Sequence, residues 1–335
     1  MRKLTDNLLK IAVSLLLGGV ILWWMYRDFD FGQLRDVLSH RMNWGWMLLS
    51  LPFGVLAQFC RGWRWRQTLE PVDEHPRAST CVHAVFLSYA LSLIVPRIGE
   101  FARCGVLKRY DGVSFPKALG TVVTERIIDS SLVALIAGIT LLCQLRVFNT
   151  FFERTGTTID GIFSRFTATG YLVTAVCVAA AAGLVWLLLR RLSFFHRVKE
   201  ALYGLWQGIT SLSSVRNLPL FIVLTLGIWV SYFLHYYLTF FCFEATEHLS
   251  VLCGLVTFIV GSMAVIVPTP NGAGPWHFAV KTMLILYGVA QTDALFFVLI
   301  VHGIQTLLVI LLGVYAWTML MIRGKKNPNQ SIIQP

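Results

Sequence analysis

The chain has 335 residues, of which 56% are hydrophobic and only 13% are charged. Soluble domains carry about 25% charged residues, so this composition excludes an ordinary soluble enzyme or binding module and, with its long apolar runs, indicates an all-α polytopic membrane protein. The formal net charge of +11 does not indicate a nucleic-acid partner, because the Lys and Arg residues lie in short loops between apolar runs, where they favour anionic lipid headgroups.

The apolar runs predict six full membrane spans in a single membrane domain, 1–322, which is followed by a polar cytoplasmic tail, 323–335. The spans are expected at 8–26, 44–60, 118–145, 170–189, 218–243 and 294–322. The first run lacks a small-residue cleavage site and is interpreted as an uncleaved span. Residues 194–213 place their apolar side chains on one helical face, which predicts an amphipathic helix on the membrane surface.

Two further apolar segments, 79–110 and 249–289, are interrupted by proline and are predicted to form helical hairpins. Their central residues are similar, with SLIVP at 92–96 and AVIVP at 264–268. The sequence leaves open whether each hairpin is re-entrant or spans the membrane fully. Two Pro-broken segments in corresponding halves of a membrane protein predict a binding site near the bilayer midplane.

The distribution of Lys and Arg predicts the orientation of the chain in a bacterial inner membrane. The strongly basic loops 61–78, 97–117 and 190–217 fall on the cytoplasmic side with both termini, whereas the loop 244–248, which has no Lys or Arg, falls outside. In this arrangement the second and third spans and the hairpin between them are repeated, in opposite orientation, by the last two spans and their hairpin. The sequence therefore predicts an inverted-topology repeat, as in many secondary transporters.

A cluster of aromatic and basic residues, RGWRWR at 61–66, follows the second span. We expect an interfacial anchor here, with the rings of Trp63 and Trp65 at headgroup level and the guanidinium groups in water or on phosphate. A clamp for a lipid headgroup is the functional alternative.

The first hairpin turns at Pro96, which suits the first turn of a helix because proline lacks an N–H group. The helix expected to begin there has its N-terminus in the membrane, where free N–H groups favour an anion. Arg97, Glu100 and Arg103 follow at helical spacing, with the carboxylate between the two guanidinium groups. This pattern indicates a phosphate site, and a salt-bridged helix in the cytoplasmic interface is the alternative.

The third span carries three ionisable residues close together, Glu125, Arg126 and Asp129. If the span begins near Lys117, they lie ~12–18 Å into the membrane at ~1.5 Å per residue. Ionisable side chains at such depth cost about 2.5–3.5 kcal/mol each unless they face partners or water. They predict a buried polar network lining a cavity, which either binds substrate or braces the arginines of the first hairpin.

The turn of the second hairpin is rich in glycine and proline. Gly272 and Gly274 allow the backbone to approach a ligand closely, and Pro275 is expected to open a helix whose N-terminus again points inward. His277 is either a proton relay or a core histidine. Neither residue spacing nor motifs in the sequence predict a metal or cofactor site.

Three stretches, VPRIGEFAR, ERIID and VPTPNGAGPWHF, resemble the lysylphosphatidylglycerol synthase transmembrane-region family of flippase-like membrane proteins. The family's patterns Pro-x-x-Gly-Glu-x-x-Arg and Glu-Arg-x-x-Asp are met by Pro96, Gly99, Glu100, Arg103, Glu125, Arg126 and Asp129. Its second hairpin is met in part, by Pro268, Pro270, Gly272 and Gly274. Trp276 and His277 stand where the family usually has Arg-Glu, a departure that bears on the substrate more than on the fold.

The resemblance implies a flippase-like transporter that moves a phosphate-bearing lipid, such as a phospholipid or an aminoacyl-phospholipid, between leaflets. Lipid aminoacylation is not expected, because the chain ends at Pro335 without the soluble synthase domain of the full-length proteins, and we do not expect an enzyme. Membrane lipids are the expected partners, through an anionic headgroup or lipid phosphate. No cofactor, metal or nucleic acid is expected, and a homo-oligomer is an open alternative to a monomer.

The expected substrate-binding residues lie on the two hairpins and the third span. They are Arg97, Gly99, Glu100, Arg103, Glu125, Arg126, Asp129, Pro268, Pro270, Gly272, Gly274, Trp276 and His277. Two other classes of function stay open. One is an intramembrane enzyme or carrier for polyprenyl-phosphate-linked envelope intermediates, with Glu125, Asp129 and His277 as acid–base groups, and the other is a non-transporting assembly partner of envelope enzymes.

Overall fold

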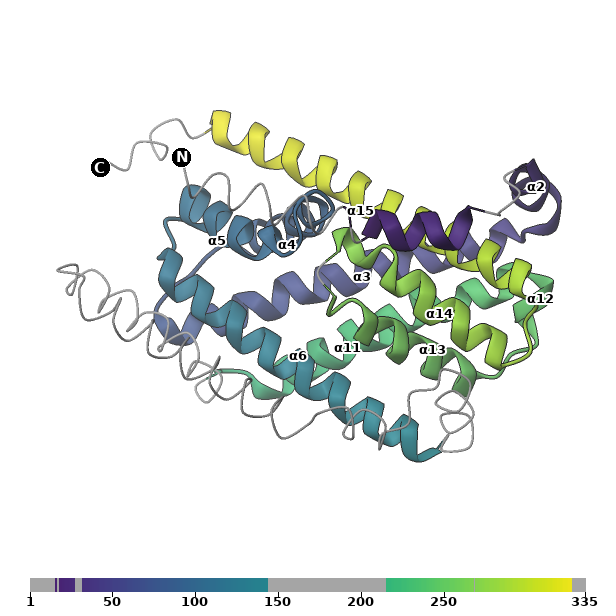
Figure 1. The fold of residues 1–335 in the computed structure, drawn as a ribbon. Helices are drawn as coiled ribbons and strands as arrows, with labels where there is room; N and C mark the ends of the chain where they lie inside the picture. Colours follow the sequence, from purple (N-terminus) through teal and green to yellow (C-terminus); the bar gives the residue numbers. More distant parts are fainter. Residues whose placement is uncertain (1–15, 17, 28–31, 144–214, 268, 327–335) are drawn as a thin grey trace, which may run out of the picture. The chain divides into compact units, whose positions relative to one another are not determined.

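The computed structural model describes residues 16, 18–27, 32–143, 215–267 and 269–326, which are coloured in Figure 1. The chain divides into two compact units, one formed by Met1–Thr140 with Gly204–Pro335 and the other by Leu141–Tyr203. Nearly all of the second unit lies outside the described residues.

The described helices repeat one pattern along the chain (Figure 1). The first set is α3 (Trp44–Leu69), α4 (Ala78–Ser92), α5 (Ile98–Asp111) and α6 (Phe115–Cys143). The second set is α11 (Leu218–Tyr237), α13 (Val251–Ala264), α14 (Pro275–Leu286) and α15 (Gln291–Lys326). In each set two short helices stand between two long ones, so the chain breaks inside both predicted hairpins.

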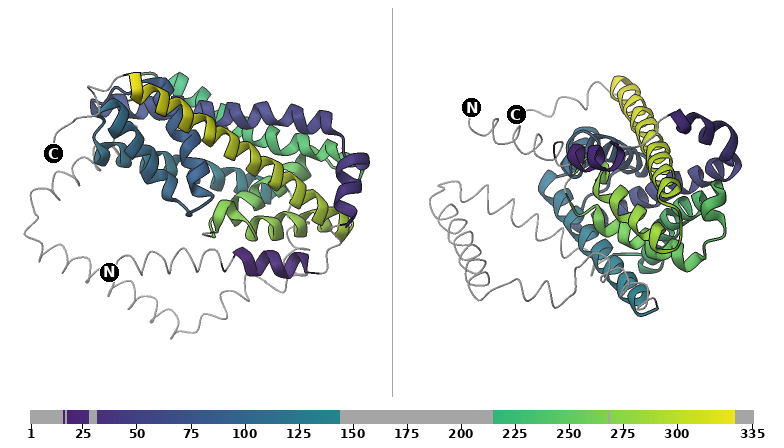
Figure 2. Two further views of the ribbon diagram at one scale, coloured as in Figure 1. Left: turned by 90° about the horizontal axis from the view of Figure 1, so that it is seen from above. Right: turned by 45° about the vertical axis from the view of Figure 1, so that its right-hand side comes forward.

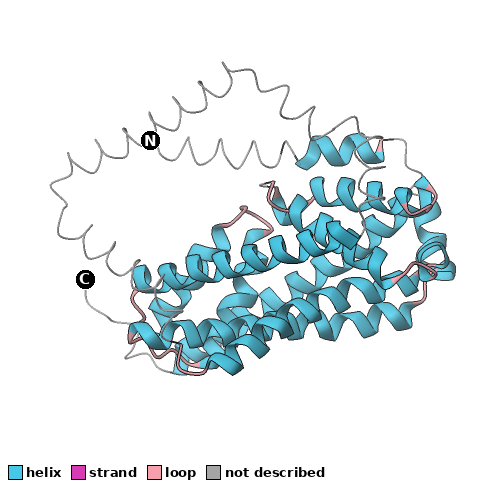
Figure 3. Ribbon diagram, turned by 90° about the horizontal axis from the view of Figure 1, so that it is seen from below, coloured by secondary structure: helices cyan, strands magenta, loops and turns pink. Residues whose placement is uncertain are grey.

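Shorter elements join these helices. They are α2 (Gly32–Asp36), the π-helix η1 (Val37–Arg41), α12 (Glu244–Glu247) and the 3-10 turns η2 (Glu70–Val72), η4 (Leu238–Cys242) and η5 (Pro270–Gly272). The described residues contain no strand beyond an isolated bridge between Met42 and Phe243 (Figure 3). The expected all-α class is confirmed for the described part of the chain.

The first hairpin turns through a residue that is neither glycine nor asparagine. Arg97 caps α5 in the left-handed conformation, with φ +64°, a region that residues with bulky side chains avoid. The helix α5 begins at Ile98, whereas the sequence analysis placed its start at Pro96. Arg97 therefore precedes the helix and does not share a helical face with Glu100 and Arg103, which corrects that expectation.

The second hairpin turns through three residues with positive φ, Asn271, Gly272 and Gly274. Glycine adopts this conformation without steric cost and asparagine tolerates it well. The helix α14 then begins at Pro275, as the sequence predicts. Pro268 lies outside the described residues.

Small residues allow the long helices and the hairpins to pack closely. The helix α3 lies along α11, and α4 packs against α5, α3 and α15 (Figure 2). A methyl group added at Gly62 would come within 2.6 Å of the Cα atom of Val82, so α3 and α4 approach closely because glycine has no side chain there. Phe240 and Phe297, with ring centroids 5.1 Å apart, lie in the largest apolar cluster.

Two helices are longer than the sequence predicted. The helix α3 runs to Leu69 instead of ending at Cys60. The helix α15 continues through Lys326, so the beginning of the expected tail, 323–335, is helical. The remainder of that tail lies outside the described residues.

By length and composition alone, two helical stretches of the described chain are suited to crossing a membrane, Leu218–Cys242 and Gln291–Arg323. The predicted span 170–189 and the amphipathic helix 194–213 fall outside the described residues, as do residues 8–15 and 17 of the first span. Their predictions are therefore untested.

Candidate functional site

Three arginines and two carboxylates form a buried ion-pair network between α3, α5 and α6. Arg61 Nη1 donates to Asp129 Oδ2 at 2.7 Å, and Arg64 Nη2 donates to Asp129 Oδ1 at 2.8 Å. Glu125 lies between Arg64 and Arg103. Its Oε1 atom is 3.4 Å from Arg64 Nη2, and its Oε2 atom is 2.8 Å from Arg103 Nη1. No side chain of the five is more than 7% exposed, so the network is removed from solvent.

Helical spacing brings these partners together. Arg61 and Arg64 are three positions apart on α3, and the two carboxylates are four positions apart on α6, so each pair presents to one face. Arg103 reaches the network from α5, and its guanidinium carbon lies 4.5 Å from the ring centroid of Trp65. The predicted polar network is present, and it ties the first hairpin to α3 and α6.

The interpretation of residues 61–66 as an interfacial anchor is wrong for Arg61, Arg64 and Trp65. Arg61 is 3% exposed, and Arg64 and Trp65 are fully buried; Trp63 is 40% exposed. A guanidinium group can be buried when it meets an opposite charge with good geometry. The carboxylates of α6 supply that charge, and α3 therefore continues into the protein instead of stopping at an interface.

The network carries more positive than negative charge, since three guanidinium groups face two carboxylates and one positive charge is left over. Among the described residues, three donor atoms of the network are buried without a hydrogen-bond partner, Arg61 Nε, Arg64 Nε and Arg103 Nη2, as is one acceptor, Glu125 Oε2. Charges interact more strongly away from water. This part of the molecule is consequently attractive to an anion.

A second, more exposed ion pair joins α5 to α6, two of the three helices that form the buried network. Arg126 Nε lies 3.1 Å from Glu100 Oε1, with the two side chains 41% and 34% exposed. The spacing in the sequence predicts that Glu100 lies between Arg97 and Arg103. That placement is wrong, because the partner of Glu100 comes from α6.

The turns of the two hairpins meet at Arg97. Its guanidinium Nη2 donates to the carbonyl oxygen of Ile266, just beyond the end of α13, at 3.4 Å. The Arg97 side chain is otherwise exposed. Two segments that are far apart in the sequence are thus in direct contact at their Pro-containing turns.

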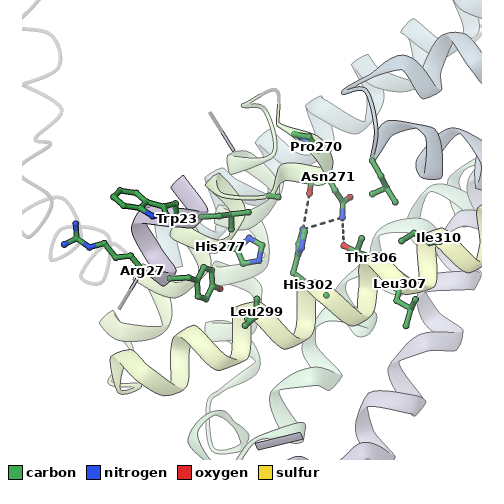
Figure 4. A pocket seen from close by; sticks show the side chains of 15 residues that line it. Trp23, Arg27, Pro270, Asn271, His277, Leu299, His302, Thr306, Leu307 and Ile310 are labelled. Atoms are coloured by element: carbon green, nitrogen blue, oxygen red, sulfur yellow. Dashed lines mark hydrogen bonds between the residues drawn. The ribbon is translucent and has the colours of Figure 1, made fainter. Parts of the chain in front are cut away.

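A cavity of about 820 Å³ borders both turns (Figure 4). Leu93 lines it from the first hairpin, and Pro270 and Asn271 line it from the second. Its other walls are the end of the N-terminal helix, 18–26, and one face of α15. Most of the lining is apolar, and no member of the ion-pair network contributes to it, so the network does not line this cavity as the sequence predicts.

Side chains of α15 hold the second turn at the edge of this cavity. Asn271 Nδ2 donates to Thr306 Oγ1 at 2.8 Å, and His302 Nε2 lies 3.1 Å from the Asn271 carbonyl oxygen. The sequence analysis did not single out these residues for this site. A weak signal was present, because His302 and Thr306 are four positions apart on one helical face.

His277 faces this group from α14. It is 3% exposed, and its ring centroid lies 4.5 Å from that of His302. The Gly274 N–H donates to His277 Nδ1 at 3.4 Å. Trp276, its neighbour, packs edge-on against Tyr236 with centroids 6.2 Å apart. Among the described residues, no group of at least three His, Cys, Asp or Glu side chains is placed to hold a metal ion.

The glycines expected to let a ligand approach are closed in by protein atoms. A side chain at Gly99 would overlap the backbone of Ser88, one at Gly272 would press on Val265, and one at Gly274 would reach the carbonyl oxygen of Gly18. These positions therefore serve close packing of helices and turns.

The thirteen predicted site residues do not form one site. Arg103, Glu125 and Asp129 meet in the buried network, and Arg97 lies at the contact between the turns. Pro270 and His277 line the cavity.

The chain matches the family model described as Lysylphosphatidylglycerol synthase TM region over residues 8–313. That range includes both hairpins, the ion-pair network and the cavity. No curated protein matches the chain.

Proposed function

The chain belongs to the family of the lysylphosphatidylglycerol synthase TM region, and from this premise we propose that it is a flippase-like transporter that moves a phosphate-bearing lipid between leaflets. The observation that carries the proposal is the meeting of the two hairpin turns at Arg97, beside a largely apolar cavity. Such a place offers a guanidinium group to a phosphate and an apolar surface to the rest of a lipid.

The charge of the first hairpin supports an anionic headgroup. The buried network leaves one positive charge uncompensated, and Arg97 adds a second, exposed one at the turn. The buried arginines are engaged with carboxylates, so we assign direct contact with the phosphate to Arg97 and an electrostatic, bracing role to the network. Glu125 and Asp129 then act as positioning residues, and the lipid leaves chemically unchanged.

The proposed setting is the inner membrane of a bacterium, with both termini in the cytoplasm. Six spans and two hairpins would form an inverted repeat, which the order long, short, short, long in 44–143 and again in 218–326 supports. In alternating access, a substrate site at the contact between the two repeats opens first to one side of the membrane and then to the other. A lipid bound beside Arg97 would lie at such a contact.

The orientation of the repeats makes a labelling prediction. A cysteine placed at Glu247 should react with a membrane-impermeant maleimide in intact cells, and one at Asp73 should react only after permeabilisation, because positive-inside counting puts these exposed positions on opposite sides. The background is favourable, since five native cysteines, at positions 60, 81, 104, 242 and 253, are buried. Cys143 and Cys177 are first replaced by serine. Equal labelling of both positions in intact cells would contradict the inverted repeat.

Loss of the Arg97 side chain should slow lipid movement. Arg97→Gly removes the guanidinium and suits the backbone, whose φ of +64° favours glycine. A hydrogen bond to a charged group is worth about 1.5–3 kcal/mol, so translocation should slow roughly 10- to 100-fold at 1.4 kcal/mol per factor of ten. The measurement is the rate at which fluorescent phosphatidylglycerol in protein-containing vesicles becomes accessible to an impermeant quencher.

Two variants control this measurement. Arg97→Lys keeps the charge and should retain most of the rate, and Arg109→Gln removes an exposed arginine from the other end of α5 and should behave as wild type. Mass spectrometry of the recovered lipid separates transport from catalysis. If Arg97→Gly moves lipid as fast as wild type, Arg97 is not the phosphate contact, and if the lipid is covalently altered, an intramembrane enzyme replaces the transporter.

A further inference from the structure

Three polar residues at the cavity, Asn271, His302 and Thr306, are turned toward one another. The side-chain amide of Asn271 donates to Thr306 at 2.8 Å, and its backbone carbonyl oxygen lies 3.1 Å from the His302 ring (Figure 4). His277 accepts from the Gly274 backbone and lies edge-on to Tyr26. Satisfied polar groups have little to offer a headgroup. Apart from Arg27 at the end of the N-terminal helix, the surface left for a ligand is therefore mainly hydrocarbon.

The dimensions of the cavity fit an extended chain. Its lining on α15 runs from Leu299 to Ile310, eleven positions apart, which is ~16 Å at ~1.5 Å per residue. That length is about half of the ~30 Å hydrocarbon core of a bilayer. The volume, about 820 Å³, is in the roughly 300–1,000 Å³ range of sites for small organic molecules.

We propose that this cavity is a binding slot for one hydrocarbon chain of a membrane lipid, separate from the headgroup contact at Arg97. The inference rests on the proposed function for its lipid substrate. Its occupant is a single chain, because the α15 part of the lining is one helical face, Leu299 to Ile310, enclosed by the N-terminal helix and the hairpin turns. Leu93 belongs to the first hairpin, and Pro270 and Asn271 belong to the turn of the second, so a chain lying in the slot passes close to the contact between the turns.

One residue of the lining is suited to testing this assignment. Gly303 faces the cavity, and an added Cβ would meet no protein atom within 4 Å. Gly303→Phe should therefore fill the slot without disturbing the fold, and a larger residue in a helix also removes the conformational cost of glycine. Gly138 on α6 has the same open surroundings but lies outside the cavity, so Gly138→Phe is the matched control.

The experiment is photo-crosslinking in phosphatidylglycerol vesicles, with two probes that carry a diazirine at the end of the chain. One is a phosphatidylglycerol with a labelled acyl chain, and the other is a labelled isoprenyl phosphate. Mass spectrometry of the digested protein should find adducts in the peptide that contains Leu299 and Ile310 with at least one probe, and the probe that labels identifies the kind of chain. Gly303→Phe should lose these adducts, and Gly138→Phe should keep them.

The crosslinking and quenching results test the hydrocarbon slot and the proposed transport separately. No adduct in this peptide with either probe, or equal adducts in wild type and Gly303→Phe, overturns the slot. Adducts that Gly303→Phe abolishes, in a protein that does not move lipid in the quenching assay, support the slot and overturn the proposed transport. If Gly303→Phe folds poorly by thermal unfolding, Gly303→Leu repeats the test with a smaller group.

Discussion

Replacing Asp129 by asparagine is expected to destabilise the protein by about 3–5 kcal/mol, the usual cost of removing one partner from a buried ion pair. The measurement is the thermal midpoint of the detergent-solubilised protein, followed by the amount that stays monodisperse. The change is nearly isosteric, so the effect reports charge and hydrogen bonding rather than volume. Only the cost of leaving guanidinium groups uncompensated predicts so large a loss.

The reason lies in the geometry around the carboxylate. Asp129 accepts from Arg61 at 2.7 Å and from Arg64 at 2.8 Å, and both arginines are at most 3% exposed. Without it, Glu125 alone would face three guanidinium groups, and the uncompensated charge would rise from one to two. Arginine cannot lose its proton to relieve this, so the protein has to open or admit water.

Two comparisons make the expectation specific. Asp73→Asn is the same chemical change at a carboxylate that is 95% exposed, and asparagine tolerates the left-handed backbone there, so it should change the midpoint little. Arg61→Met combined with Asp129→Leu should lose less than the sum of the single changes, since apolar pairs replace buried ion pairs with little loss. An Asp129→Asn protein as stable as wild type would mean that water or lipid already screens the network.

The sequence was informative where a residue type is unfavourable in the surrounding segment, such as a carboxylate in an apolar span or a proline in a helical run. Carboxylates inside an apolar span need partners, and that need predicted the network around Glu125 and Asp129. Proline and glycine inside apolar runs predicted both hairpin breaks, because neither continues a helix well. Such local violations are visible in one sequence without knowledge of what lies across the fold.

The partners themselves could not be predicted, because they depend on contacts between distant elements. Arg61 and Arg64 have the spacing and the neighbouring tryptophans of an interfacial anchor. The positions of α6 and α11 in the fold make them buried. His302 and Thr306, which contact Asn271, are 31 and 35 residues away from it in the sequence. The cavity is likewise formed by several elements, none of which signals it alone.

Gly99→Ala is expected to cost at least about 3 kcal/mol, the upper end of the usual range for overpacking. The glycine is buried where α5 crosses α4, and a methyl group there would overlap the carbonyl oxygen of Ser88 and lie 2.5 Å from Ser92 Oγ. A carbonyl inside a helix cannot rotate away as a side chain can, so the hairpin has to separate. Thermal unfolding in detergent measures the loss.

Gly105→Ala is the matched control, because Gly105 is on the same helix and an added Cβ would meet nothing within 4 Å. That change should stabilise by about 0.5–1 kcal/mol, the penalty that glycine carries in a helix. A second variant separates the two obstacles at Gly99: Ser92→Ala removes the hydroxyl and leaves the Ser88 carbonyl, so Gly99→Ala with Ser92→Ala should recover little. If Gly99→Ala instead keeps the wild-type midpoint and stops lipid movement, the glycine contacts substrate, as the sequence pattern indicated. A loss of stability that accounts for the loss of transport assigns it to the packing of the hairpin.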